Sequence, residues 1–243
     1  MGTVPDITAT IPGPPAVAAP KLDDDTKATE FHLTGFSRFH NVPINPTQLI
    51  VEVIPAFLSK RPLKPGAVLA STSVMKVAAE TTRAEVEDMY RQLDKPTHPV
   101  LRARVRSDRR IVFIHLGVNM RVTHFQLELQ GRNEATFSCP DELGWTPIKR
   151  PIDKQNRDIS AVCRTTLPLH KLIEDLKHKG FAVEMSTDAG RFVCNWVYYN
   201  SLKLAEKNDA SSLFVHVPPA TVYPVQKQVE FIAALLDCIV SLP

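Results

Sequence analysis

The sequence has few glycines, few cysteines and no long apolar run. Only nine of its 243 residues are glycine, and they form no glycine-rich phosphate-binding loop. Its four cysteines are too few and too scattered for a disulfide scaffold, and none form a C-x-x-C pair. No window reaches the roughly 20 apolar residues of a membrane span, and no signal peptide is recognisable. We therefore expect a cytoplasmic protein with free thiols and no membrane association.

The charge balance gives no reason to expect a nucleic-acid partner. The chain has 29 lysines and arginines against 26 acidic residues, a formal net charge of +3, which is too small for a broad basic field. One local cluster of arginines could suggest such a partner. Its alternation with apolar residues also fits an edge strand with a solvated face, which we favour. The cluster consists of Arg102, Arg104, Arg106, Arg109 and Arg110.

Composition and length indicate one large domain preceded by a tail. The chain is 44% hydrophobic and 23% charged, as is typical of globular proteins. Residues 1–29 are rich in proline and end near the acidic run Asp23–Asp25, with no periodicity that would bury a face. We expect residues 1–29 to be a mostly disordered tail and residues 30–243 to form a single catalytic domain.

Apolar periodicity predicts alternating strands and helices along that domain. Strands are expected at residues 30–34, 67–74, 111–118, 121–129, 181–185 and 213–217, the third lying centrally because it is almost wholly apolar. Helices are expected at residues 47–54, ended by Pro55, and at 78–93, 166–179, 192–206 and 225–242. Residues 133–158 should be mostly loop. The alternation predicts a three-layer α/β/α sandwich with a mainly parallel sheet.

Three titratable residues occupy positions where open α/β sheets place their sites. Cys194 lies in the first turn of a predicted helix, where the helix dipole stabilises a thiolate. His216 ends an apolar strand, and Glu128 follows one and could orient an imidazole. On spacing alone, each of these three residues is more commonly structural; a lone cysteine in a helix, for example, usually packs as a small hydrophobe. A further histidine, His115, lies within an apolar strand and fits a hydrogen-bonded histidine of the core. Pattern alone leaves both interpretations open.

Four blocks of sequence together resemble the pyroglutamyl-peptidase I family (pyrrolidone-carboxyl peptidases, cysteine peptidase family C15), in particular its plant-like eukaryotic branch. The blocks are LTGFSRFHNVPINPT at residues 33–47, a segment from FIHLGVN to LELQGRNEATFSCPDELGW at residues 113–145, DAGRFVCNWVYYNSL at residues 188–202, and FVHVP at residues 214–218. They occur in the family's order, and four matches in register are hard to obtain by accident.

The resemblance implies a phosphorylase/hydrolase-like fold with a mixed sheet and a thiol peptidase that removes N-terminal pyroglutamate from peptides. It implies Cys194 as nucleophile, His216 as general base and acid, and Glu128 as the group that orients His216. No metal or other cofactor is required. Phe36 and Phe39 would flank the lactam ring.

Several positions depart from the family pattern, and two other functions stay open. The backbone at Val118 corresponds to the lactam-binding group, but Arg38 replaces a proline between the two phenylalanines. Leu129 and Ser138 replace family arginines, which puts oxyanion stabilisation in doubt. The alternatives are a pyroglutamyl-peptide binding module and a thiol hydrolase of another modified N-terminus. Whether the chain forms a homo-oligomer also stays open, because the last helix could pack on the sheet or on another subunit.

Overall fold

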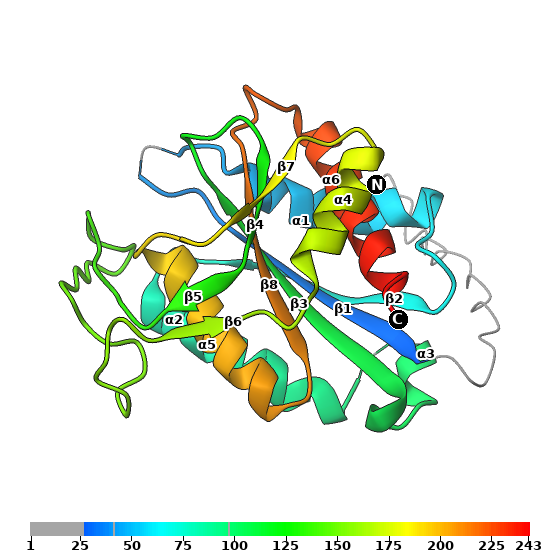
Figure 1. The fold of residues 1–243 in the computed structure, drawn as a ribbon, viewed down its shortest axis with the longest axis horizontal. Helices are drawn as coiled ribbons and strands as arrows, with labels where there is room; N and C mark the ends of the chain where they lie inside the picture. The colour runs from blue at the N-terminus through cyan, green and yellow to red at the C-terminus, as the bar shows by residue number, and fades with distance from the viewer. Residues whose placement is uncertain (1–26, 41, 97) are drawn as a thin grey trace, which may run out of the picture.

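The computed structural model describes residues 27–40, 42–96 and 98–243, which form a six-stranded sheet between two layers of helices (Figure 1). The strand order is β2-β1-β3-β8-β4-β7, and β4 and β8 are the antiparallel neighbours in an otherwise parallel arrangement. The predicted three-layer α/β/α fold with a mainly parallel sheet is confirmed. The six strands are β1 (Ala28–Phe36), β2 (Ala67–Met75), β3 (Arg109–Val118), β4 (Phe125–Glu128), β7 (Val183–Ser186) and β8 (Ser211–Val217).

Helices α1, α4 and α6 cover one face of the sheet, and α2 and α5 cover the other (Figure 1). Each layer closes over its own apolar core. Within the described ranges, no helix is long and apolar enough to cross a membrane. The helices are α1 (Pro46–Lys60), α2 (Ala79–Arg91), α3 (Pro99–Arg102), α4 (Leu169–His178), α5 (Val193–Lys207) and α6 (Val225–Val240), with 3-10 turns η1 (Gln92–Asp94) and η2 (Arg106–Asp108).

Two predicted boundaries were wrong. Helix α1 does not end at Pro55 but continues to Lys60. Pro55 lies on the exposed side of α1, and the helix continues past it although proline cannot donate the backbone hydrogen bond at that position. At the N-terminus, residues 1–26 of the predicted tail lie outside the described residues. The last two tail residues, Ala28 and Thr29, already belong to β1.

The arginine-rich segment is not an edge strand, which corrects that prediction. Its first part forms α3 and η2, because Pro96 and Pro99 interrupt an extended ladder and β2 already pairs with the open side of β1. Its last two arginines, Arg109 and Arg110, begin β3, a strand inside the sheet that pairs with β1. The strand expected at residues 121–129 is shorter as well. The Asn119 side chain accepts the Arg121 N–H at 3.1 Å in a turn, and pairing starts only at Phe125.

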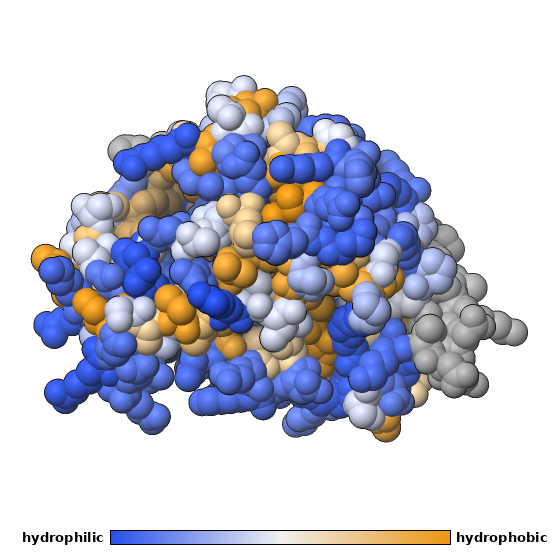
Figure 2. Space-filling view, in the orientation of Figure 1, coloured by the Kyte–Doolittle hydropathy of each residue, from blue (hydrophilic) through white to orange (hydrophobic). Residues whose placement is uncertain are grey.

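A small antiparallel ribbon that the sequence did not predict lies across α5 (Figure 1). It pairs β5 (Gln130–Arg132) with β6 (Val162–Arg164). The loops between these two strands carry exposed apolar side chains, including Leu143 and Ile148. Figure 2 shows apolar patches over these loops, and others nearer the middle of the same face, set among hydrophilic side chains.

Candidate active site

Strand register brings a histidine and a glutamate onto one face of the sheet. His216 on β8 is the Cα partner of Gly117 on β3, and Glu128 on β4 is the partner of Phe214. Side chains two residues apart on a strand share a face, so Glu128 and His216 are diagonal neighbours across an antiparallel pair. The His216 Nδ1 atom and the Glu128 Oε1 atom lie 2.7 Å apart.

Glu128 is fully buried and held from two sides. Its backbone carbonyl accepts a hydrogen bond from the Tyr198 hydroxyl at 2.7 Å, which ties the end of β4 to α5. One carboxylate oxygen, Oε1, faces the imidazole, and the other, Oε2, has no hydrogen-bond partner among the described residues. A buried carboxylate with a single partner strongly favours a protonated imidazole beside it.

Cys194 approaches the same place from the helix layer. It is the second residue of α5, which covers this face of the sheet, and its Sγ atom lies over Gly117. A Cβ atom added to Gly117 would be 3.1 Å from Sγ and 2.8 Å from two ring atoms of Phe214. The missing side chain of Gly117 therefore provides the space in which the sulfur sits next to the strand that carries His216.

The electrostatics of His216 differ from those of an ordinary histidine. Burial by itself would lower its pKa, but interactions with the Cys194 sulfur and with Glu128 outweigh burial and raise the pKa to about 9. At neutral pH the imidazole therefore holds its proton between a carboxylate and a sulfur. The arrangement can supply a proton to a group that leaves a carbonyl carbon when the sulfur attacks that carbon.

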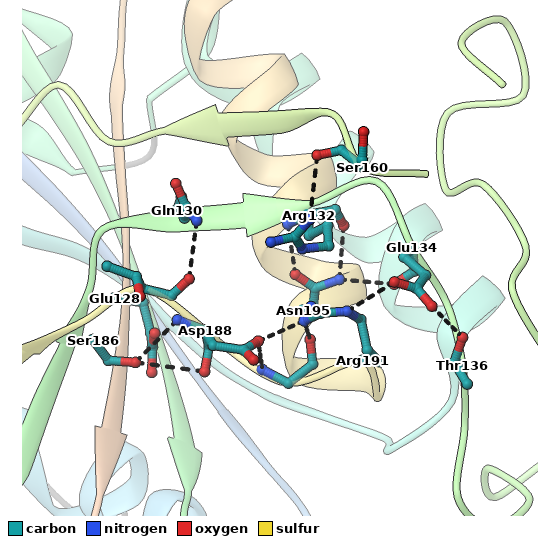
Figure 3. Close-up of polar contacts among 12 residues, drawn as sticks. Glu128, Gln130, Arg132, Glu134, Thr136, Ser160, Ser186, Asp188, Arg191 and Asn195 are labelled. Carbon is teal, nitrogen blue, oxygen red and sulfur yellow. Dashed lines mark hydrogen bonds and ion pairs between the residues drawn. The ribbon is translucent and has the colours of Figure 1, made fainter. Parts of the chain in front are cut away.

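The turn that leads into α5 is fixed by an ion-pair network (Figure 3). Arg191 donates from Nε to Glu134 at 3.0 Å and pairs with Asp188, and Glu134 also accepts from the Thr136 hydroxyl at 2.7 Å. Gly190 has a φ of 80°, which only glycine adopts without strain. The network holds the chain just before Cys194 in one conformation.

Asn195, the residue after the cysteine, has a structural role that requires a side-chain amide. Its side chain accepts the Arg132 N–H at 2.8 Å and donates to the carbonyls of Arg132 and Glu134, thereby joining α5 to β5 (Figure 3). No side chain among the described residues caps the start of α5. The first N–H groups of α5 therefore have no partner within the helix, and they lie at the same helix end as Cys194.

The three predicted substrate residues lie on separate segments of the chain near Cys194 and His216. Phe36 is buried at the end of β1 with its ring centroid 6.5 Å from that of Phe214. Phe39 is half-buried, with its ring 5.2 Å from Phe192, the residue before α5. Val118 is the last residue of β3, one position beyond Gly117.

None of the three departing positions places an arginine beside the sulfur. The Arg38 side chain is exposed, Leu129 is half-buried at the end of β4, and Ser138 is exposed in the following loop. Within the described part of the chain, no group of three or more His, Cys, Asp or Glu residues is arranged to hold a metal ion.

Another histidine of the same sheet, His115, has a structural role. His115, which the sequence placed in the core, is fully buried and bonds to Thr34 and Ser201 at 2.8 Å each. Burial is the main reason why its pKa falls to about 3, so the ring is neutral. The sequence did not indicate the roles of Gly117 and Tyr198. Both roles depend on contacts between segments far apart in the sequence.

Comparison with known proteins shows which family this chain matches. The family model described as pyroglutamyl peptidase matches residues 30–231. A Streptococcus suis protein named pyrrolidone-carboxylate peptidase is 26% identical over 188 residues, which cover 76% of each chain. A Thermoanaerobacter protein of the same name is 31% identical over 90 residues, and the match spans only 43% of that relative's length.

Solved structures share the fold. The pyroglutamyl peptidase I from Bacillus amyloliquefaciens superposes with a TM-score of 0.70 at 18% identity, covering 88% of this chain and 96% of that one. The pyrrolidone carboxyl peptidase from Fervidobacterium islandicum gives a TM-score of 0.68 at 23% identity, covering 86% and 96%. These relatives are bacterial, so the resemblance to a plant-like branch of the family stays a prediction. Because the family model matches most of the sequence, the chain belongs to the pyroglutamyl peptidase family.

Proposed function

We propose that this protein is a cysteine exopeptidase that removes N-terminal pyroglutamate from peptides. One observation carries the proposal: in a chain of this family, a helix N-terminus places Cys194 above a His216–Glu128 pair bonded at 2.7 Å. A sulfur, a proton carrier and a carboxylate that orients it are the three parts of thiol acyl transfer. Residues 30–243 form the catalytic domain in this proposal.

In the first half-reaction, the Cys194 thiolate attacks the pyroglutamyl carbonyl carbon and forms a C–S bond. The C–N bond to the next residue breaks, and the leaving amine takes the proton held by His216. In the second half-reaction, a water molecule gives a proton to His216 and its oxygen attacks the thioester. The C–S bond then breaks, pyroglutamic acid leaves, and the Cys194 thiolate and the protonated His216 are restored. Glu128 stabilises the imidazolium and keeps Nδ1 facing away from the sulfur.

The start of α5 would stabilise the oxyanion in place of the absent family arginines. The uncapped first turn presents backbone N–H groups next to the sulfur, and the helix dipole favours negative charge there. Such donors are rigid because Asn195 and Arg191 fix this turn against β5 and the chain that follows it. Leu129 and Ser138 are therefore compatible with catalysis.

The substrate slot would use apolar walls and backbone groups. Phe36 and Phe39 would flank the flat lactam ring, and the backbone at Val118 would bond to it. A peptide with a free α-amine would bring a charge into this dry slot, at a cost of several kcal/mol when it is unpaired. Pyroglutamyl peptides, which lack that charge, would be the substrates, and cytoplasmic peptides are the expected source.

Hydrolysis of a fluorogenic pyroglutamyl amide by the purified protein under reducing conditions tests the proposal. We expect release from the pyroglutamyl compound and none from the matching prolyl compound, whose ring carries a charged amine and no lactam carbonyl. The Glu128→Gln variant keeps the size of the side chain but loses the charge, and it should reduce kcat with little change in KM. A folded wild-type protein that binds a pyroglutamyl peptide without cleaving it would support the binding module instead. Cleavage of another blocked N-terminus alone would support the other thiol hydrolase.

A further inference from the structure

A second feature of the molecule is a pocket rich in positive charge, here called the basic pocket. It has a volume of about 420 Å³, within the range of small-molecule sites, and five of its side chains are cationic while one is acidic. The chain as a whole has only a small excess of positive charge. The charged residues that line the pocket are Asp94, Lys95, Arg102, Arg104, Arg106 and Arg109.

Two of the arginines are held in place by the fold. Arg109 is buried, and it donates from Nη1 to Glu30 at 2.7 Å and from Nη2 to the Leu93 carbonyl at 2.8 Å. Arg106 pairs with Asp94 at 3.0 Å and also donates to a backbone carbonyl. These guanidinium groups form a fixed wall, and their charges are partly balanced by the carboxylates they contact.

Two other cations carry charge into the pocket without a carboxylate. Among the described residues, no ion pair joins Lys95 or Arg102 to an acidic side chain. Arg102 is nevertheless oriented, because its Nε donates to the Pro96 carbonyl at 3.2 Å. That bond uses Nε, so the two terminal nitrogens of Arg102 can form a bidentate pair with an oxyanion.

The basic pocket is remote from the candidate active site. Arg109 is the first residue of β3 and Val118 is its last, so the two sites lie at opposite ends of one strand. At about 3.3 Å per residue, that separation is about 30 Å. A ligand in the basic pocket would not touch a peptide at Cys194.

We propose that the basic pocket binds a small phosphate-bearing anion with at least two negative charges. Several cations around one concave space favour a multiply charged ligand over a single carboxylate, and the planar guanidinium fork matches phosphate oxygens. The small size of the pocket favours a compact anion over the backbone of a nucleic acid, which needs an extended basic track. Arg106 would line the base of the site, the buried Arg109 would support it from within the fold, and Arg102 and Lys95 would contact the ligand.

Calorimetric titration of the full chain with inorganic triphosphate tests this inference. We expect saturable binding that weakens as salt is added, and a loss of at least about tenfold in affinity in the Lys95→Ala/Arg102→Ala variant. Both side chains are exposed, so the variant should fold. The matched control, Arg157→Ala/Lys177→Ala, removes the same charges from exposed positions outside the pocket and should bind triphosphate as the wild type does.

Two further ligands separate the sources of a phosphate signal. Sulfate, a single small dianion, should bind more weakly than triphosphate, and short single-stranded DNA should bind more weakly still. Equal affinity in all variants, or no binding by the wild type, would overturn the inference. Tighter binding of DNA than of triphosphate would also overturn it, in favour of a nucleic-acid surface. Hydrolysis of the pyroglutamyl amide should be the same in both double variants, so this result does not depend on the proposed peptidase function.

Discussion

Adding one methyl group at Gly117 should separate the geometry of the active site from the stability of the fold. The new Cβ of a Gly117→Ala variant would lie 2.8 Å from two ring atoms of Phe214 and 3.1 Å from the Cys194 sulfur. Both distances are shorter than a normal contact between such atoms, so the ring and the sulfur must move. Phe214 is fully buried and its ring lies 5.8 Å from Tyr198, so the ring has little room to give.

Two magnitudes follow from this crowding. Overpacking a buried site by one methyl group costs about 1–3 kcal/mol of unfolding free energy. A displacement of the nucleophile by a fraction of an ångström to 1 Å can reduce the rate by roughly 100-fold. We expect kcat on a pyroglutamyl amide to fall by roughly that factor in Gly117→Ala, with a smaller change in KM.

The control is a glycine whose replacement costs stability away from the site. Gly180 has a φ of 84° and open space around its Cβ position, so Gly180→Ala should cost about 1–2 kcal/mol through backbone strain alone. Urea unfolding and kcat would be measured for both variants. Stability should fall in both, and kcat should fall only in Gly117→Ala. Wild-type kcat in a folded Gly117→Ala variant would refute the placement of the sulfur against β3.

Three further predictions concern the groups around the sulfur. Because the pKa of His216 is raised to about 9, the imidazolium persists below that pH and is lost above it, so kcat/KM should decline near pH 9. A decline near pH 6.5, the value for an ordinary histidine, would contradict this. The Arg191→Gln variant loses the ion pair with Glu134, which should loosen the turn before α5 and lower kcat by roughly tenfold. The Arg191→Lys variant keeps the charge and should lose less. Equal kcat in both variants and the wild type would show that the turn keeps its conformation without the ion pair. Tyr198→Phe leaves the Glu128 carbonyl without its donor and should lower the unfolding free energy by about 1–2 kcal/mol, as measured in urea; an unchanged stability would count against that bond.

The sequence predicted the elements that carry the candidate site better than the contacts between them. Strong apolar periodicity located β3, β8 and α5 to within two or three residues, because buried strands and amphipathic helices have clear patterns. The predicted strand ends and helix start made Cys194, His216 and Glu128 candidates, but such positions do not distinguish a structural cysteine from a reactive one. Only the four resembling blocks assigned them catalytic roles. The structure brings these residues together, while their roles stay proposals.

What the sequence could not predict depends on register between distant segments. The space for the sulfur at Gly117 exists only because β3 pairs with β8 so that Gly117 faces His216. The antiparallel insertion of β4 next to β8 has no local signal, yet it places Glu128 diagonally to that histidine. Asp141 was assigned only to a family block, but its carboxylate accepts the Ala79 N–H at 2.9 Å and so holds the start of α2.

The most direct test of the central claim is to trap the acyl-enzyme. Wild-type protein would be mixed with a reactive pyroglutamyl ester, quenched in acid within the first turnover, and analysed by intact mass and peptide mapping. We predict one added pyroglutamyl group, located on Cys194 and absent from the Cys194→Ala variant, with Cys139, Cys163 and Cys238 unmodified. Turnover of the ester with no adduct on Cys194, or with the adduct on another cysteine, would contradict the account.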